Sequence, residues 1–205
     1  MDFDPKEHWQ KVYHTKKTNE VSWYQSYPAI SLDLIASTGI GLTQKIIDVG
    51  AGASILVDKL LEKGFKDITV LDISSKAIEA AQQRLGKDAQ KVNWIEVDVT
   101  AFSPAHPYDL WHDRAVFHFL TGPEDRKKYI EVMNKMVKPH GHVIMATFAL
   151  EGPPQCSGLK VERYDSDKLA KELGDSFELI ESVDEEHLTP WKAGQKFIYC
   201  CFMKK

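Results

Sequence analysis

The sequence is poor in cysteine and has no excess of positive charge. Its 205 residues include three cysteines, Cys156, Cys200 and Cys201, an odd number with two adjacent members that does not suggest a disulfide framework. We therefore expect a reducing, cytoplasmic setting. The formal net charge of −4 gives no basic surface for nucleic acid, so we expect no nucleic-acid partner.

Long apolar runs and targeting signals are also missing. No stretch approaches the roughly 20 apolar residues that a membrane helix needs, so we expect no membrane partner. The opening residues, MDFDPKEHWQ, contain no apolar signal-peptide segment, so we expect no secretory signal. No spacing of the C-x₂-C or H-x₃-H kind accompanies Cys156 and His187, so we predict no metal. The length suits a single domain, residues 1–205.

What the chain does have is a regular alternation of strand-like and helix-like segments. Strands are predicted at 45–49, 67–72, 92–97, 108–113 and 142–148, and helices at 5–18, 29–38, 54–63, 74–85 and 124–137. After a helix at 166–173, two strands, 177–183 and 196–203, follow with no helix between them. The predicted fold class is α/β: a three-layer, Rossmann-like sheet, mostly parallel, with an antiparallel C-terminal edge hairpin and helices on both faces.

The stretch DVGAGAS, residues 48–54, follows the first predicted strand of the sheet. Ligands of open parallel sheets bind at such strand ends, and Gly50 and Gly52 allow close backbone approach. The third glycine of a dinucleotide-binding loop is missing, since Ile55 occupies its position. Asp48 would repel a pyrophosphate and attract an ammonium or sulfonium group. A dinucleotide-dependent oxidoreductase is therefore disfavoured.

Two further acids follow the next two predicted strands. Asp72 ends the second strand, where a carboxylate can accept hydrogen bonds from a ribose diol. Asp98 follows the third strand, where a carboxylate can accept from an adenine amine. Three acids at successive strand ends suit a cationic nucleoside. The alternative is that an acid at a strand end caps the next helix.

Five motifs resemble, in order and spacing, those of class I S-adenosylmethionine (SAM)-dependent methyltransferases: IIDVGAG, VLDIS, IEVDVT, YDLWHDRAVFHFL and VKPHGHVIMATF. The resemblance covers residues 40–150 strongly and implies SAM as cofactor, with S-adenosylhomocysteine as product. It implies that the cofactor is bound by Asp48, Gly50, Ala51, Gly52, Asp72, Ile73, Asp98, Val99, Asp113 and Arg114. Ser54 stands where this family usually has its third glycine.

The resemblance also suggests a division of the domain into three segments. Residues 1–40 are expected to form a helical lid or cap, 41–150 the SAM-binding core, and 151–205 the acceptor side with the edge hairpin. A SAM-binding module without catalysis is an alternative of another class, because the motifs identify the donor and not the reaction. The oligomeric state is left open.

The expected chemistry is methyl transfer, in which a protein mainly aligns the donor and the acceptor. The catalytic candidates are His118, Asp113 and Arg114, which follow or end the fourth predicted strand. An imidazole accepts protons near neutral pH, although an ionised acceptor needs no general base. The alternative for His118 is a turn residue bonded to the backbone.

The sequence points to two classes of acceptor. The segment WHDRAVFHFLTGPEDRKKY resembles thiopurine- and thiol-type methyltransferases, which predicts a small-molecule acceptor such as a thiol or another soft nucleophile. The segment EVSWY resembles protein lysine methyltransferases, so a protein lysine is the alternative acceptor. The acceptor-site candidates lie on predicted loops: Trp23, Tyr24, Arg163, Tyr164 and His187. Trp9 and Tyr13, four residues apart, are expected to form a helix face packed on the core.

Overall fold

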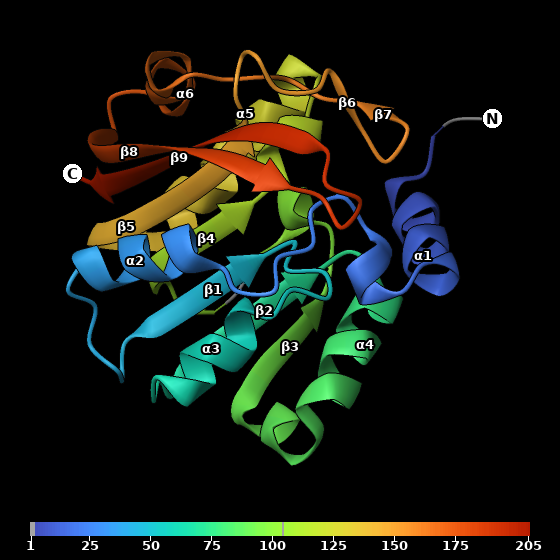
Figure 1. Cartoon of the computed structure of the whole chain (residues 1–205). Helices are drawn as coiled ribbons and strands as arrows, with labels where there is room; N and C mark the ends of the chain where they lie inside the picture. Colours follow the sequence, from blue (N-terminus) through green and yellow to red (C-terminus); the bar gives the residue numbers. More distant parts are fainter. Residues whose placement is uncertain (1–2, 104) are drawn as a thin grey trace.

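The computed structural model describes residues 3–103 and 105–205, and its centre is one seven-stranded sheet ordered β3-β2-β1-β4-β5-β9-β8 (Figure 1). The strands are β1 (Lys45–Val49), β2 (Asp67–Asp72), β3 (Val92–Glu96), β4 (Tyr108–Arg114), β5 (Val137–Phe148), β8 (Phe177–Leu188) and β9 (Gly194–Lys204). Strands β1 to β5 pair in parallel, whereas β9 runs antiparallel to both β5 and β8. The predicted parallel sheet with an antiparallel C-terminal edge is confirmed.

Helices cover both faces of this sheet (Figure 1). They are α1 (Pro5–Thr15), α2 (Ala29–Ser37), α3 (Leu56–Glu62), α4 (Ser75–Leu85), α5 (Pro123–Met136) and α6 (Ser166–Leu173), with short 3₁₀ turns η1 (Thr18–Glu20), η2 (Gly86–Lys91), η3 (Val99–Ala101) and η4 (Phe117–Phe119). Alternate side chains of a strand point to opposite faces, so Ile46 belongs to the core cluster that includes α2 and α3, whereas Ile47 belongs to the cluster that includes α5 and α6. Both are fully buried, which explains why β1 is continuously apolar up to Asp48.

Local signals explain where several helices begin. Asp4 caps α1, because its side chain accepts hydrogen bonds from the backbone N–H groups of Lys6 and Glu7. Ser74 caps α4 in the same way through the N–H of Ala77. Gln10 of α1 bonds to the hydroxyl groups of Ser74 and Ser75, so α1 is anchored beside the start of α4. This contact brings the N-terminal helix to the strand ends.

Some predicted boundaries are wrong. Helix α1 ends at Thr15 rather than 18, because Lys16 adopts an extended conformation. Strand β5 begins at Val137, directly after α5, and not at 142. Pro139 is typical of a break, but here it lies within extended backbone next to a register irregularity opposite Tyr108 and Leu110. A small hairpin, β6 (Gln155–Cys156) and β7 (Leu159–Lys160), was not predicted and lies beside α1 (Figure 1).

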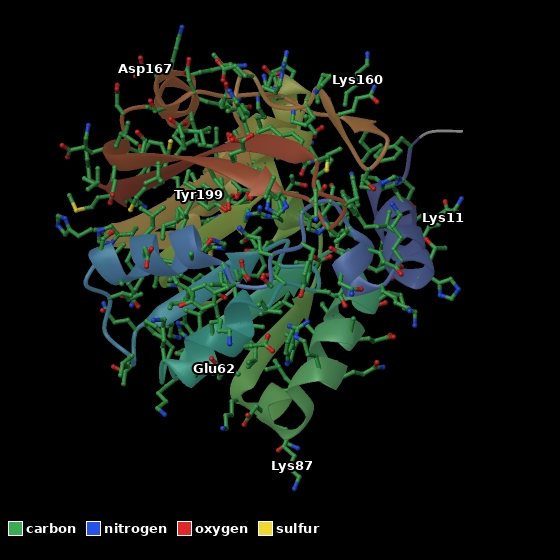
Figure 2. All side chains as sticks on the ribbon, in the orientation of Figure 1. Lys11, Glu62, Lys87, Lys160, Asp167 and Tyr199 are labelled. Atoms are coloured by element: carbon green, nitrogen blue, oxygen red, sulfur yellow. The ribbon has the colours of Figure 1, made fainter. Side chains whose placement is uncertain are left out.

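Charged side chains such as Lys87 and Asp167 project from the periphery, whereas Tyr199 of β9 is fully buried (Figure 2). No helix within the described ranges is both long and apolar enough to cross a membrane.

Candidate cofactor and acceptor site

A cleft lies at the carboxyl ends of β1, β2 and β4. It is bounded on the other side by α1 and by the chain between α1 and α2. Eight of the ten predicted cofactor residues line it: Asp48, Gly50, Ala51, Asp72, Ile73, Asp98, Val99 and Arg114. The sheet therefore brings together residues that are up to 66 positions apart in the sequence (Asp48 to Arg114).

The glycine loop after β1 is tightly enclosed. Gly50 and Gly52 both have φ of +57°, in the left-handed region that favours glycine. A Cβ atom on Gly50 would lie 1.9 Å from Cγ2 of Val116, and one on Gly52 would lie 2.1 Å from the hydroxyl oxygen of Tyr13. Both glycines are thus required by close neighbours as well as by backbone conformation.

Arg84 of α4 holds this loop from its outer side, a role that the sequence did not reveal. Its guanidinium donates to the carbonyl oxygens of Ala53 (2.8 Å) and Ser54 (2.7 Å) and to the carboxylate of Asp58. The hydroxyl of Ser54 accepts from the N–H of Leu56 at the start of α3. These bonds fix the loop where the third glycine of the motif is missing.

Asp72 binds the same loop from inside. Its two carboxylate oxygens accept from the N–H groups of Gly52 (2.7 Å) and Ser74 (2.8 Å). Burial raises the pKa of Asp72 to about 6, with the two backbone hydrogen bonds opposing the shift. Each carboxylate oxygen can accept more than one hydrogen bond, so the side chain can still receive ribose hydroxyls.

Asp98 follows β3, which is separated from β1 and Asp48 by β2 in the sheet. It caps η3, where its Oδ1 accepts from both the backbone N–H and the hydroxyl of Thr100, at 2.8 and 2.7 Å. Ile73 and Val99 place apolar side chains along the cleft between Asp72 and Asp98. This half of the cleft offers hydrogen-bond acceptors next to an apolar wall, which suits a nucleoside.

A cluster of aromatic rings also lines the cleft, and one of them, Tyr13, reaches Gly52 of the glycine loop. Ring centroids of Trp9 and Phe119 lie 5.0 Å apart, those of Trp9 and Trp23 5.8 Å, and those of Tyr13 and Trp23 6.4 Å. All four rings line the cleft. The expectation that Trp9 and Tyr13 pack on the core is therefore wrong, because α1 stands over the strand ends and turns these rings toward the cleft.

Arg114, at the end of β4, joins this aromatic cluster to the sheet edge. Its Nε donates to the hydroxyl of Tyr199 (2.7 Å), its Nη1 donates to the carbonyl of Trp23 (3.0 Å), and its guanidinium lies 4.5 Å from the ring centre of Phe197. Tyr199 in turn donates to Glu185 (2.9 Å). Arg114 of β4 thus connects the N-terminal segment, through Trp23, to β9, through Tyr199.

Comparison with known proteins agrees with this geometry. Residues 47–143 match the family model described as "Methyltransferase domain". The matched segment contains all ten predicted cofactor residues, in agreement with the resemblance to class I SAM-dependent methyltransferases.

The names of the individual relatives specify different acceptors. This chain is 30% identical over 104 residues to the "Ubiquinone biosynthesis O-methyltransferase" of Pectobacterium carotovorum, and the alignment covers 51% of this chain and 43% of that protein. It is 22% identical over 144 residues to the "eEF1A lysine and N-terminal methyltransferase" of Bos taurus, covering 70% of this chain and 20% of that protein. The chain thus spans less than half the length of these curated relatives.

The fold of this chain is shared with solved structures. The N-methyltransferase NodS from Bradyrhizobium japonicum, in complex with S-adenosylhomocysteine, superposes with a TM-score of 0.74 at 19% identity. The alignment covers 96% of this chain and 98% of that one. The Rossmann-like fold class predicted from the sequence is confirmed.

Two of the three predicted catalytic residues, Asp113 and His118, do not line the cleft. Asp113 is fully buried, and its carboxylate accepts from the N–H groups of Val116 and Phe117 and from the hydroxyl of Tyr129. Burial raises the pKa of Asp113 to about 6. Asp113 therefore supports the turn after β4 and is not among the residues that line the cleft.

His118 is likewise fully buried, 4.5 Å from the ring centre of Phe119 and 4.8 Å from that of Phe148. Its Nδ1 accepts from the backbone N–H of Phe148 at 3.3 Å, and burial lowers its pKa to about 3. This position matches the alternative that His118 is a turn residue bonded to the backbone. His118 is not among the residues that line the cleft.

The acceptor candidates divide in the same way. Trp23 and Tyr24 line the cleft, whereas Tyr164 is in the core, and Arg163 and His187 bond to the backbone carbonyls of Gly152 and Ser22. The cleft lining also includes Cys156 and Leu159, which belong to the unpredicted hairpin. Burial raises the pKa of the Cys156 thiol to about 11, so it stays protonated at neutral pH.

The described part of the chain contains no group of three or more His, Cys, Asp or Glu side chains arranged to hold a metal ion.

Proposed function

We propose that the protein transfers the methyl group of SAM to a small-molecule acceptor, a thiol or a related soft nucleophile. The observation that carries this proposal is the continuity of the cleft. It runs from three acids at successive strand ends to a cluster of aromatic rings. In this proposal residues 1–40 form the lid, 41–150 hold the cofactor and 151–205 contribute to the acceptor side.

The residues of the donor half fit SAM. Oδ2 of Asp48 is buried without a hydrogen-bond partner among the described residues, as an acceptor reserved for a cation would be. Asp72 would receive the ribose hydroxyls, and Asp98 with Val99 would receive the adenine ring. The bound sulfonium would supply an already activated methyl group, so the protein's contribution is alignment.

The acceptor half favours a soft, anionic nucleophile. Nη2 of Arg114 has no hydrogen-bond partner in the described chain, although Oε2 of Glu185 lies 3.6 Å away. Arg114 lines the cleft beside the aromatic cluster. A guanidinium in this position lowers the pKa of a nearby thiol and favours the thiolate, which needs no general base. The absence of His118 from the lining is consistent with such an acceptor.

Turnover with labelled SAM tests the proposal. Small aliphatic and aromatic thiols, primary amines and lysine-containing peptide arrays would be supplied in parallel, and release of S-adenosylhomocysteine would be measured. We expect turnover with thiols and a roughly tenfold higher KM for thiols in Arg114→Met. Arg126→Met, which removes a guanidinium outside the cleft, is the matched control.

The same screen separates the alternatives. Methylation of peptide lysines without turnover of thiols would establish the protein acceptor that the EVSWY segment and the eEF1A methyltransferase relative suggest. Binding of S-adenosylhomocysteine without turnover of any acceptor would indicate a non-catalytic module.

The three free, buried cysteines support the proposed cytoplasmic location.

A further inference from the structure

A buried chain of three polar side chains connects the sheet to α2 at the floor of the cleft. Asp48 and His112 are register partners on the adjacent parallel strands β1 and β4. Their side chains meet with 2.7 Å between Oδ1 and Nδ1, and Nε2 of His112 lies 2.9 Å from Oγ of Ser31. Asp48, His112 and Ser31 are only 2, 3 and 1% exposed, and all three line the cleft.

The chemistry of these groups fixes the direction of the hydrogen bonds. A carboxylate has no hydrogen to donate, so Nδ1 of His112 must carry the hydrogen of the bond to Asp48. In a neutral imidazole Nε2 is then an acceptor, and the hydroxyl of Ser31 donates to it. Asp48 therefore selects the tautomer of His112 with hydrogen on Nδ1, Ser31 holds the orientation of the ring through Nε2, and His112 restricts the rotation of the Asp48 carboxylate.

Asp48 differs in one respect from the two other buried acids at the strand ends. Both oxygens of Asp72 and both oxygens of Asp113 accept hydrogen bonds from the protein. In Asp48, His112 occupies Oδ1, while Oδ2 has no partner among the described residues. A buried acceptor without a partner is destabilising, so its retention in the cleft points to a ligand that donates to it.

We propose that His112 and Ser31 are positioning residues that hold Oδ2 of Asp48 toward the α-ammonium group of the methionine moiety of SAM. This inference rests on the proposed function, because it requires SAM in the cleft. The bond from His112 would prevent the carboxylate from rotating, so that the ammonium meets an oriented, desolvated acceptor. Neither residue needs to touch the cofactor for this effect.

Two ligands that differ in the relevant group test the proposal. S-adenosylhomocysteine carries the amino-acid moiety, and 5′-methylthioadenosine lacks it but keeps the thioether and the nucleoside. Calorimetric titration of both ligands would be made with wild type, His112→Leu, His112→Asn and Ser31→Ala. The asparagine amide places an N–H group near the position of Nδ1, so it serves as the conservative rescue.

We expect His112→Leu to weaken binding of S-adenosylhomocysteine roughly 10- to 100-fold and binding of 5′-methylthioadenosine less than about twofold. His112→Asn should recover most of the lost affinity, and Ser31→Ala should lose about threefold for S-adenosylhomocysteine alone. If His112→Leu does not fold, the ligand difference in Ser31→Ala and His112→Asn decides the question.

Equal losses for the two ligands would overturn the proposal, because they would show general damage to the cleft. Unchanged binding of S-adenosylhomocysteine in His112→Leu and Ser31→Ala would also overturn it. Wild-type protein that binds neither ligand would instead contradict the proposed function, so the two failures are distinguishable.

Discussion

The donor half and the acceptor half of the cleft are held together by different kinds of contact. In the donor half, backbone amides bind a carboxylate at the end of the neighbouring strand, as Gly52 and Ser74 bind Asp72. In the acceptor half, side chains from distant parts of the chain meet, as Arg114 meets the carbonyl of Trp23. The proposed donor half is thus built mainly on the strand ends, with side chains such as Arg84 supporting it, whereas the proposed acceptor half depends on side chains that join the N-terminal segment to β4.

The largest expected effect comes from filling the donor half. Gly50→Ala places a Cβ against Val116 and forces alanine into the left-handed region. We expect the free energy of unfolding in urea to fall by about 4 kcal/mol, from backbone strain and overpacking together. Gly39→Ala is the control, since Gly39 has φ of +69° but open space around it, and should lose only about 1–2 kcal/mol. Equal losses in both variants would show that contact with Val116 contributes nothing.

The second prediction concerns pH. Burial raises the pKa of Asp72 and of Asp113 to about 6 from an ordinary value of 3.8. The folded protein then binds these protons more tightly than the unfolded chain, so the free energy of unfolding decreases as pH rises from about 4 to about 6. Each acid contributes at most about 3 kcal/mol to this decrease.

Asp113→Asn removes one of the two titrating groups and should roughly halve the pH-dependent decrease, measured by urea unfolding between pH 4 and 7. The variant can be less stable than wild type at every pH without affecting the test, because the quantity compared is the slope of the free energy of unfolding against pH. A slope identical to that of wild type would contradict the assignment.

A third prediction separates the two halves directly. Trp9→Ala removes contacts with Trp23 and Phe119, each worth about 0.5–1.5 kcal/mol. We expect the KM for the acceptor to rise about tenfold, while the dissociation constant of S-adenosylhomocysteine changes less than about twofold. Trp191→Ala is the matched control, because Trp191 is 59% exposed and should leave both constants unchanged. A parallel loss of cofactor affinity in Trp9→Ala would mean that the halves are not independent.

The smallest effect is expected from the outer support of the glycine loop. Arg84→Lys loses the fork that binds the carbonyls of Ala53 and Ser54, and should lower cofactor affinity about threefold and stability by about 1 kcal/mol. Arg126→Lys also removes hydrogen bonds from a guanidinium to two backbone carbonyls, since Nη1 of Arg126 donates to both Leu120 and Thr121. It should lower stability equally while cofactor affinity stays unchanged, and calorimetry measures both.

These two halves also differ in how well the sequence predicts them. The ends of β1 and β2 were predicted to the residue, because buried apolar runs, glycines and acids mark them locally. Asp48, Gly50 and Asp72 could therefore be assigned to one site from spacing alone. Their detailed partners could not, since the bonds from Arg84 and His112 join residues about 30 and 64 positions away.

The acceptor half was predicted poorly for the same physical reason. Trp9 and Tyr13 have the spacing of a core-facing helix, and nothing local shows that their partners are Trp23 and Phe119. Tyr164 and His187 have loop-like neighbours in sequence, yet both side chains are buried. Polar residues near an expected loop indicate exposure only when no distant segment covers them.

The link between the first and last parts of the chain affects the order in which the protein can mature on the ribosome. Gln25 near the start donates to Glu185 of β8, and Arg114 bonds to Tyr199 of β9. Every strand end of the donor half has been synthesised once β4 is complete, about 70 residues before Glu185 emerges. The contacts that join the N-terminal segment and Arg114 to β8 and β9 can therefore form only after the last two strands have been synthesised.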